Sequence, residues 1–491
     1  MNAPGLISVN ASRRAGVDTA AMNALAATDT RDWPFDPDLL RRYDRPGPRY
    51  TSYPTAPQFH AGFDAAAFRA QASAGNAEAA PRDLSLYVHV PFCRSPCFYC
   101  GCNRVVTRNH ARGQVYLDRL LRELDMLAPM FGPEREVVQL HLGGGTPNFL
   151  EPRQIADLVD AIEARFRFSR SATRDFSIEL DPRFIDAEGI QLLTVAGFNR
   201  ASLGVQDFDL DVQMAINRVQ SVDGTLEVID ACRAYGMRSI NVDLIYGLPR
   251  QTLAGFGRTL DTVVNARPDR LAIYGYAHLP DLFRAQRQIA TDELPTPEQK
   301  LALLGLAVEK LSAAGYRYIG MDHFALPDDE LARAQRDGSL HRNFMGYTTH
   351  ARTDLVGLGV SAISHVGDSF SQNHRDLPAW EAAIDAGTLP LWRGLALEHD
   401  DVLRADVIQR LMCQGEIDMH AFGRDHGIDF ATYFATELDA LTTLRDDGLI
   451  DLQPARIRAT PRGRPLLRLA AMVFDRYLPA ANQPQRYSRT I

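Results

Sequence analysis

Short apolar runs that alternate with amphipathic stretches restrict the fold of this chain more than any other feature. Each run is rich in β-branched and aromatic residues and is bounded by Gly, Pro or Asp, as buried strands are. Repeated strand–helix alternation predicts an α/β fold with a parallel sheet, either open or curled into a barrel. The predicted strands are residues 84–90, 137–142, 176–180, 200–205, 239–247 and 270–279.

The remaining segments lie on either side of this alternating region. Residues 1–35 lack clear periodicity and are predicted to be a disordered tail. Residues 36–83 contain prolines and polar aromatics, and we expect them to cover the mouth of the barrel. The catalytic unit and its extension are expected over 84–370, and a mostly helical domain over 371–491.

The C-terminal region has the order helix, helix, hairpin, helix, which suggests a small winged-helix-like domain. Winged helices often bind DNA, but the sequence offers no convincing base-reading element, so a packing or lid domain is favoured. The predicted elements are helices at about 400–413 and 428–446, a hairpin at 448–463 and a helix at 463–478.

Composition excludes several broad classes of protein. The formal net charge of −8 over 491 residues does not favour non-specific nucleic-acid binding. No run approaches the roughly 18 apolar residues of a membrane helix. The N-terminus lacks the basic-then-apolar order of a secretory signal. We therefore expect a cytoplasmic protein that binds neither nucleic acid nor membrane.

Four of the six cysteines lie in one loop, PFCRSPCFYCGCN, directly after the first predicted strand. They are Cys93, Cys97, Cys100 and Cys102. In a reducing compartment, clustered cysteines more often bind a metal or perform redox chemistry than form disulfides. Thiolates at this spacing suit an iron–sulfur cluster, and three ligands leave one iron of a four-iron cluster open.

Structural zinc is the competing interpretation of this loop. Zinc usually takes two separated Cys or His pairs that form a tetrahedron. Here four candidates crowd together, and Cys102 follows Cys100 by two residues, which is poor geometry for four simultaneous ligands. A set of inert buried cysteines is the other alternative, and such clustering disfavours it.

Beyond the loop, several motifs carry a family resemblance. C-x3-C-x2-C after the first strand of a βα barrel resembles the radical S-adenosylmethionine (SAM) superfamily. Within it, the chain is similar to the oxygen-independent coproporphyrinogen III oxidases from about residue 43 onward. The motifs that carry this likeness include YVHVPFC, RYTSYPT, HLGGGTPNFL, GVQDF, INVDLIYGLP, HRNFMGYTT and GLGVSAIS. The resemblance implies a partial (β/α)6 TIM-like barrel with a small, mostly helical C-terminal domain.

The resemblance also implies the cofactors and their ligands. Cys93, Cys97 and Cys100 would bind a [4Fe–4S] cluster, whose open iron is chelated by SAM. Cys102 would not bind the cluster but would serve catalysis, together with Tyr87 and Glu179. The family holds a second SAM in the same pocket, so two molecules of SAM are expected.

Further cofactor-binding residues are carried over by position. Tyr99 stands where the family places the second residue of an aromatic pair, although the order here is Phe-Tyr rather than Tyr-Phe. From the residues alone, Arg218 would be a solvated surface side chain, and Asp243 would be a helix N-cap or a partner in a buried salt bridge. The residues implied for the first SAM are Tyr87, Gly144, Gly145, Thr146, Glu179 and Ile363, and those for the second are Tyr99, Gln206, Arg218, Asp243 and Ala277.

The implied reaction is the oxidative decarboxylation of two propionates of coproporphyrinogen III to vinyl groups, which yields protoporphyrinogen IX for haem biosynthesis. It would proceed through a 5′-deoxyadenosyl radical, with an electron donor such as flavodoxin or ferredoxin. A monomer is expected. Carboxylates favour arginine partners, and Arg45, Arg49 and Arg104 are the predicted propionate contacts.

Related functions remain as alternatives. A radical SAM haem chaperone would share the cluster loop but lack the Cys102 position, RYTSYPT and much of the C-terminal region, all of which this chain has. A haem-opening or haem-methylating relative is disfavoured by the extent of motif agreement. A zinc-bound binding module would contain neither iron nor sulfide.

Overall fold

The computed structural model describes residues 36–478, so the predicted tail over 1–35 lies outside the described residues. All six predicted strands form, and they pair side by side in parallel and in chain order. Their C-terminal ends therefore meet at one edge of the sheet. They are β1 (Asp83–Val90), β4 (Glu136–Gly144), β6 (Asp175–Leu180), β7 (Arg200–Gln206), β8 (Ser239–Tyr246) and β9 (Arg270–Gly275).

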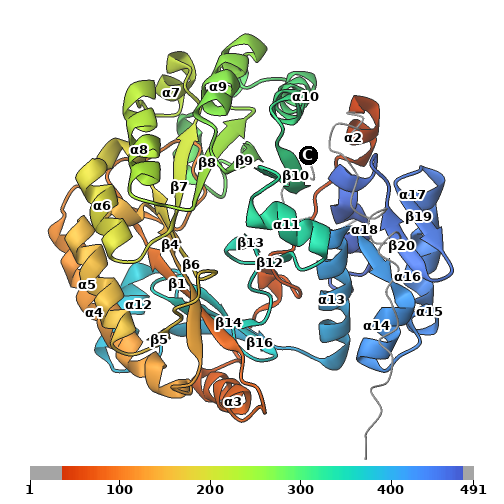
Figure 1. The fold of residues 1–491 in the computed structure, drawn as a ribbon, viewed down its shortest axis with the longest axis horizontal. Helices are drawn as coiled ribbons and strands as arrows, with labels where there is room; N and C mark the ends of the chain where they lie inside the picture. Colours follow the sequence, from red (N-terminus) through yellow and green to blue (C-terminus); the bar gives the residue numbers. More distant parts are fainter. Residues whose placement is uncertain (1–35, 479–491) are drawn as a thin grey trace, which may run out of the picture.

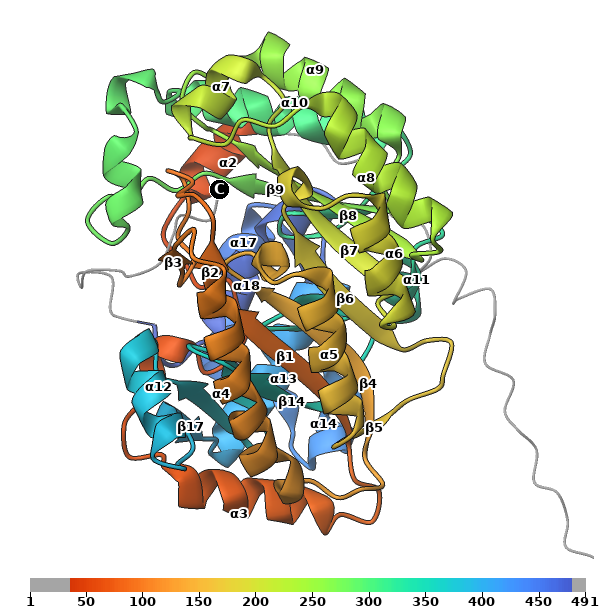
Figure 2. The ribbon, with the colours of Figure 1, turned by 90° about the vertical axis from the view of Figure 1, so that its left-hand side faces the viewer.

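Helices cover the outer, convex face of this curved sheet (Figures 1 and 2). On α4, the first of these helices, Leu117, Leu120, Leu124 and Leu127 form a buried apolar stripe that faces the sheet. The arrangement is a partial (β/α)6 barrel, as predicted. The covering helices are α4 (Ala111–Leu127), α5 (Pro152–Glu163), α6 (Ala187–Val195), α8 (Val222–Ala234), α9 (Leu253–Ala266) and α10 (Pro297–Ala313).

The sheet continues beyond the six parallel strands at both edges. On one side β1 pairs in parallel with β14 (Thr353–Leu358), and antiparallel strands follow as far as Ala396. The expected domain boundary at 371 therefore falls inside β16, and the main sheet runs past it. The added strands are β15 (Ile363–His365), β16 (Ser369–Asn373) and β17 (Leu391–Ala396) on that side, and β11 (His323–Ala325) and β10 (Arg317–Gly320) beside β9.

The C-terminal domain contains the predicted hairpin, β19 (Ile450–Gln453) with β20 (Arg456–Ala459), which β18 (Glu416–Asp418) extends to a three-stranded sheet. The prediction of one long helix over 428–446 is wrong in detail, because the segment forms three short helices. Non-helical backbone at Phe434 separates the first two. The helices are α13 (His399–Gln414), α14 (Met419–His426), α15 (Phe430–Tyr433), α16 (Ala435–Ala440), α17 (Thr442–Asp446) and α18 (Leu467–Val473).

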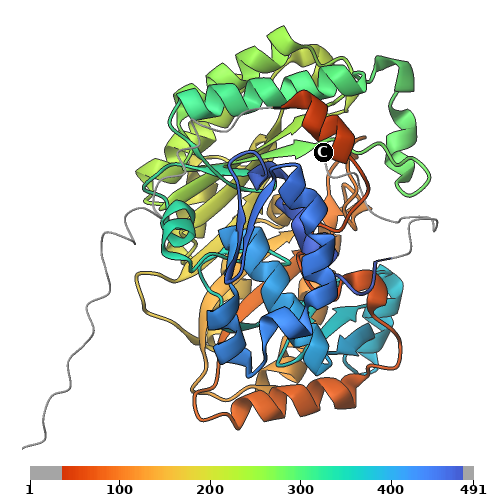
Figure 3. The same cartoon turned by 90° about the vertical axis from the view of Figure 1, so that its right-hand side faces the viewer.

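The N-terminal segment does not simply cover the barrel mouth. Its first helix, α2 (Pro37–Tyr43), lies beside the C-terminal domain (Figure 3), and Leu39, Leu40, Tyr50 and Tyr53 belong to the buried core of that domain. The Tyr50 hydroxyl donates to Asp475 at 2.9 Å, and the Arg476 amide donates to the Tyr53 hydroxyl at 3.1 Å. Helix α3 (Ala65–Asn76) lies instead near the end of the sheet where β1 begins (Figure 2).

Short elements complete the described part of the chain. Between residues 36 and 478, no helix is both long and apolar enough to cross a membrane. The short elements are β2 (Phe92–Cys93), β3 (Val105–Val106), β5 (Arg167–Phe168), α7 (Leu210–Ala215), α11 (Glu330–Asp337), β12 (His341–Asn343), β13 (Gly346–Thr348) and α12 (Leu377–Asp385).

The buried carboxyl of Glu123 connects helix α4 to the turn after β14. Glu123 accepts hydrogen bonds from the Gly359 amide at 2.7 Å and from Asn373 at 2.7 Å. Burial nevertheless raises the pKa of Glu123 to about 7. A carboxyl with a raised folded-state pKa binds more protons when folded than when unfolded, so it lowers stability as pH rises between the two values.

Replacing Glu123 with Gln should remove this pH dependence. The wild type should lose on the order of 3 kcal/mol of unfolding free energy between about pH 4.5 and about pH 7 through this group, and E123Q should lose less. Denaturant titrations across that range test the slope. The glutamine side chain has one acceptor oxygen where the carboxylate has two, so E123Q also changes the absolute stability. The test therefore compares the pH dependence of the unfolding free energy and not its absolute value. Equal slopes for the two proteins would contradict the assignment.

Candidate functional site

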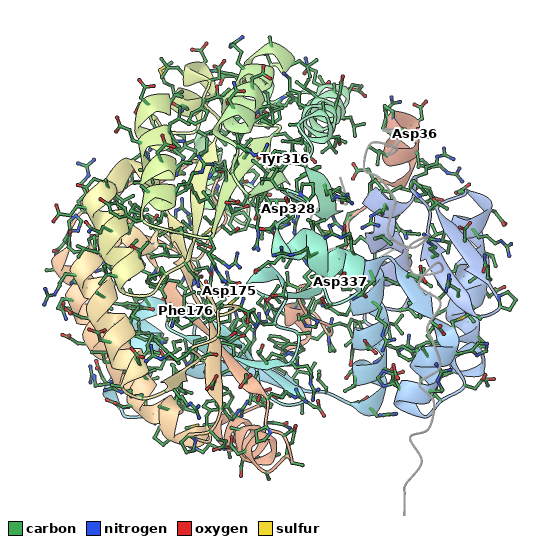
Figure 4. The ribbon with its side chains drawn as sticks, in the orientation of Figure 1. Asp36, Asp175, Phe176, Tyr316, Asp328 and Asp337 are labelled. Atoms are coloured by element: carbon green, nitrogen blue, oxygen red, sulfur yellow. The ribbon has the colours of Figure 1, made fainter. Side chains whose placement is uncertain are left out.

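The concave face of the sheet is polar. Along the parallel strands, inward polar side chains alternate with outward apolar ones, as side chains on successive strand residues must. Figure 4 labels one such pair on β6, Asp175 and Phe176. Asp175 accepts from Gln139 of the neighbouring strand at 3.3 Å, whereas Phe176 packs against Phe168 in the outer core. The barrel interior therefore suits a charged ligand.

The cysteine loop lies at the C-terminal end of β1. Two backbone hydrogen bonds fix it, from Val105 to Pro91 at 2.7 Å and from Thr107 to Cys93 at 2.9 Å. They pair β2 with β3 in parallel, so the chain returns beside its own starting point and wraps the intervening cysteines into a compact loop. The predicted position of the cysteines, directly after the first strand, is confirmed.

Each of the three predicted cluster ligands has a hydrogen-bonding partner at its sulfur. The Thr146 hydroxyl lies 3.3 Å from Cys93 Sγ, Arg218 Nη1 donates to Cys97 Sγ at 3.6 Å, and the Cys102 amide donates to Cys100 Sγ at 3.3 Å. Hydrogen bonds to sulfur tune iron–sulfur clusters. The donor set therefore fits three thiolates.

The electrostatics of Cys100 agree with this fit. A hydrogen bond from the Cys102 thiol outweighs burial and, with the charge of Arg104, lowers the pKa of Cys100 to about 6. The thiolate is the form that binds metals. Within the described chain, no three His, Cys, Asp or Glu side chains converge as they would on a single metal ion. A four-iron cluster accepts each thiolate at a different iron, so such convergence is not required.

The glycine loop rests directly on the cysteine loop. The Gly145 amide donates to the carbonyl of Val90 at 2.8 Å, and a Cβ at Gly145 would lie 2.7 Å from the backbone of Pro91. Gly144 has φ +116°, and a Cβ there would meet the ring of His89. Glycine is thus required at both positions for the loops to touch.

A first group of side chains surrounds Tyr87. Its ring stacks on His141 with a centroid distance of 5.8 Å, and His141 Nε2 lies 3.3 Å from a carboxylate oxygen of Glu179. The Gly144 amide donates to the other oxygen of Glu179 at 3.1 Å. Burial opposes ionisation of Glu179, but His141 and this amide outweigh it and lower its pKa. Ile363 reaches the same region, because its carbonyl packs against Gly357, which pairs with Tyr87.

A second group lies at the ends of β7 and β8. Arg218 is buried rather than solvated; it pairs with Asp181 at 3.0 Å and donates to the Gly204 carbonyl at 2.6 Å. A Cβ at Gly204 would contact both Arg218 and Gln206, so these two side chains lie together. Gln206 has φ +70°, an uncommon backbone conformation that redirects the chain where β7 ends.

Asp243 faces the same interior. It accepts from Asn241 at 2.8 Å and from Ser202 at 3.1 Å. Burial, reinforced by the negative charge of Glu179, raises the pKa of Asp243 to about 7. It is therefore neither a helix cap nor half of a buried ion pair, and it connects the second group electrostatically to the first.

The remaining predicted residues lie around the cysteine loop. Gln286 donates to the carbonyl of Tyr99 at 2.9 Å and to that of Ala277 at 3.2 Å, which holds these two positions together. Burial raises the pKa of Tyr99 well above its usual range, although the nearby Arg218 opposes this. Cys102 is exposed at the edge of the loop. The structure thus brings the residues predicted to bind the cluster and SAM to one end of the barrel.

The predicted propionate arginines are more scattered. Arg49 forms an ion pair with Asp322, and Arg104 donates to the Cys97 carbonyl at 3.1 Å. Arg104 thus supports the cysteine loop, and Arg45 lies in the N-terminal segment before it. The sequence reasoning missed His89, His141, Ser202, Asn241 and Asp181 as site residues. The polar residue at every second position of strands that are otherwise apolar was the signal that could have found them.

Comparisons with known proteins agree with this site. The Radical SAM superfamily model matches residues 87–263, which include both loops, and the HemN C-terminal domain model matches residues 397–466. The fold and the cysteine loop thus define a radical SAM protein.

Proteins similar in sequence and structure identify the family within the radical SAM superfamily. The chain is 50% identical to the oxygen-independent coproporphyrinogen III oxidase of Pseudomonas aeruginosa, over 94% of this chain and 100% of the relative. It is 46% identical to that of Escherichia coli strain K12, over 94% and 99%. The solved structure of coproporphyrinogen III oxidase (HemN) from Escherichia coli, a radical SAM enzyme, matches with a TM-score of 0.86 at 45% identity, covering 91% of this chain and 99% of that one. The chain belongs to the oxygen-independent coproporphyrinogen III oxidase family.

Replacing Arg218 with Ala should destabilise the protein markedly. The substitution leaves Asp181 buried with only Arg183 as an ionic partner, and removing one member of a buried pair typically costs about 3 kcal/mol or more. The control is R165A, whose ion pair with Asp125 is largely exposed and should cost about 1 kcal/mol or less. Denaturant unfolding measures both, and similar losses in the two variants would refute the expectation.

Proposed function

We propose that this chain catalyses the oxygen-independent oxidative decarboxylation of two propionates of coproporphyrinogen III to vinyl groups, yielding protoporphyrinogen IX in haem biosynthesis. The observation that carries the proposal is the convergence of three hydrogen-bonded thiols and two groups of polar side chains at one end of a polar barrel. The family relationship identifies the substrate class. The protein is thus an oxidoreductase of the radical SAM type.

Cys93, Cys97 and Cys100 would hold a [4Fe–4S] cluster, each through its thiolate. When bound, the cluster and SAM would supply a 5′-deoxyadenosyl radical able to remove a hydrogen atom from a propionate. Loss of carbon dioxide, with one electron passing to an external electron acceptor, would then leave the vinyl group. The chain's own residues bind and orient the reactants. Glu179, kept ionised by His141 and the Gly144 amide, suits an ammonium or ribose hydroxyl partner.

The first group of side chains is arranged for one SAM. Tyr87 offers a ring face beside His141, and Gly144, Gly145 and Thr146 present backbone close to the cysteines. Ile363 adds an apolar contact opposite β1. The second group, which consists of Tyr99, Gln206, Arg218, Asp243 and Ala277, would hold a second SAM. The separation of the two groups along the strand ends supports two cofactor molecules in one pocket.

Cys102 is proposed as a catalytic thiol rather than a ligand. Both its amide and its thiol donate to Cys100, which keeps the thiol beside the proposed cluster ligands, and its exposed position leaves it accessible to a substrate. Arg49 is proposed as a propionate contact, because its charge acts on Tyr274 of β9 in the barrel interior. Arg45 and Arg104 remain secondary proposals for this role.

The electron donor is proposed to be a flavodoxin or ferredoxin that approaches the cysteine loop. We further propose that the protein is a cytoplasmic monomer without a nucleic-acid or membrane partner. We propose that the catalytic unit and its extension run from residue 84 to the end of β17, because the main sheet continues to that strand, and that the C-terminal domain begins with α13 and includes Leu39, Leu40, Tyr50 and Tyr53 in its core. A haem chaperone or a haem-degrading enzyme is the alternative function.

The function is tested anaerobically with the full chain. After cluster reconstitution, the protein should convert coproporphyrinogen III to protoporphyrinogen IX in the presence of dithionite and SAM, as mass spectrometry would show. Cleavage of SAM without decarboxylation would assign the chain to one of the alternative functions. Iron and sulfide analysis distinguishes a cluster from zinc.

The role of Cys102 predicts a separable defect. C102S should keep its iron and sulfide and still cleave SAM, but its decarboxylation rate should fall by about 100-fold or more, because a serine hydroxyl is a far weaker acid than a thiol. C97S is the matched variant and should lose the cluster itself. Loss of iron from C102S to the level of C97S would make Cys102 a ligand instead.

A further inference from the structure

A small hairpin closes the open side of the barrel. It consists of β12 (His341–Asn343) and β13 (Gly346–Thr348), and it lies outside the main sheet. In Figure 1 it sits between the barrel strands and α13. Gln139 of β4 donates to the Thr348 hydroxyl at 3.3 Å, and the Tyr347 ring meets the His323 ring edge-on at 5.3 Å. The hairpin thus forms part of the barrel wall.

Arg342 on this hairpin is buried, with 5% of its surface exposed. Its guanidinium lies over the Tyr347 ring, 4.7 Å from the centroid. Its Nε and Nη1 atoms are buried, and neither has a hydrogen-bond partner among residues 36–478. A buried charge without a partner is costly, so native proteins normally pair it or provide it for a ligand.

The charges nearest to Arg342 are mainly positive. Burial first, and then the charges of Arg342 and Arg468, lower the pKa of Arg49 to about 10. Burial and the charges of Arg342 and Arg49 also lower the pKa of His323 well below its usual value. The carboxylate in this region, Asp322, forms its ion pair with Arg49. Arg49 thus has a carboxylate partner, whereas the Nε and Nη1 atoms of Arg342 have no hydrogen-bond partner in the part of the chain that the structure describes, which favours an anionic ligand there.

This positive region is continuous with the reactive end of the barrel. Tyr274, on β9, interacts electrostatically with Asp243 and Glu179 and also with Arg49 and Arg342. Its ring meets the His323 ring edge-on at 6.1 Å, and His323 in turn contacts Tyr347, over which Arg342 lies. A cleft of about 1980 Å³ also reaches Arg342 but is not lined by the cysteine loop. Arg342 therefore lies away from the cysteine loop and is connected to Tyr274 through two aromatic rings.

We propose that Arg342 binds the carboxylate of a substrate propionate that does not react, and so determines how the tetrapyrrole is oriented in the barrel. This inference rests on the proposed function. A reacting propionate must lie beside the cofactor groups, whereas Arg342 lies away from the cysteine loop. A guanidinium stacked on an aromatic ring keeps its donors in a fixed plane, as carboxylate recognition requires. Arg342, which lies within the HRNFMGYTT motif, is thus a specificity-determining residue whose role the motif alone did not indicate.

The test replaces Arg342 with Met, which keeps the length of the side chain and removes its charge. R342M should raise KM for coproporphyrinogen III about tenfold or more while kcat changes little, because a hydrogen bond to a charged group is lost from binding. R336M, at an exposed arginine that lines the same cleft, is the control and should leave KM unchanged. An unchanged KM in R342M would overturn the inference.

Two further measurements separate this role from a structural one. The product keeps the propionates that do not react, so R342M should weaken binding of protoporphyrinogen IX by the same factor; unaltered product binding would refute the assignment.

The ligand-free R342M variant should melt no lower than the wild type, since an unpartnered buried charge is removed. A clearly lower melting temperature would make Arg342 structural. Failure of the wild type to decarboxylate coproporphyrinogen III would overturn the proposed function itself.

Discussion

The parallel pairing of β1 with β4 on one side and β14 on the other is the constraint on which the whole site depends. In that register Tyr87 lies opposite His141 in one neighbour and Gly357 in the other. The same pairing brings the cysteine loop, the glycine loop and Ile363 to one end of the sheet. Because backbone hydrogen bonds fix this register, the cofactor groups are positioned by the most rigid part of the molecule.

The sequence predicted the barrel strands well because their apolar runs are short and clearly bounded. The cysteine and glycine loops were also predictable, since each directly follows a strand and parallel strands end together. The buried ion pair of Arg218 with Asp181 was not predictable. It joins the segments that follow two neighbouring strands, and local pattern does not report which side chains of such segments meet.

Predictions were poorest where tertiary contacts override local pattern. The helical periodicity of 428–446 is real, but packing of Phe430 and Phe434 into the domain core accompanies a bend in the chain. The N-terminal segment was expected at the mouth of the barrel, yet Tyr50 and Tyr53 are core residues of the C-terminal domain. Aromatic content alone indicates burial but does not identify the surface that buries it.

Polarity inside the barrel distinguishes this fold from a TIM barrel whose interior is filled with branched aliphatic side chains. Ser202, Asn241 and Asp243 satisfy one another by hydrogen bonds and thereby hold a hydrophilic interior that apolar packing would close. The outer face supplies the hydrophobic core instead, between the sheet and its helices. Stability and ligand capacity thus reside on opposite faces of the same strands.

The insertion of the N-terminal segment into the C-terminal core has a consequence for synthesis on the ribosome. Leu39, Leu40, Tyr50 and Tyr53 cannot reach their final neighbours until residues such as Phe474 have been made. The barrel between them can fold earlier, as domains generally do during translation. The apolar side chains of the segment therefore stay exposed to solvent until nearly the whole chain has been synthesised, so the segment and the C-terminal core are completed together, late in synthesis.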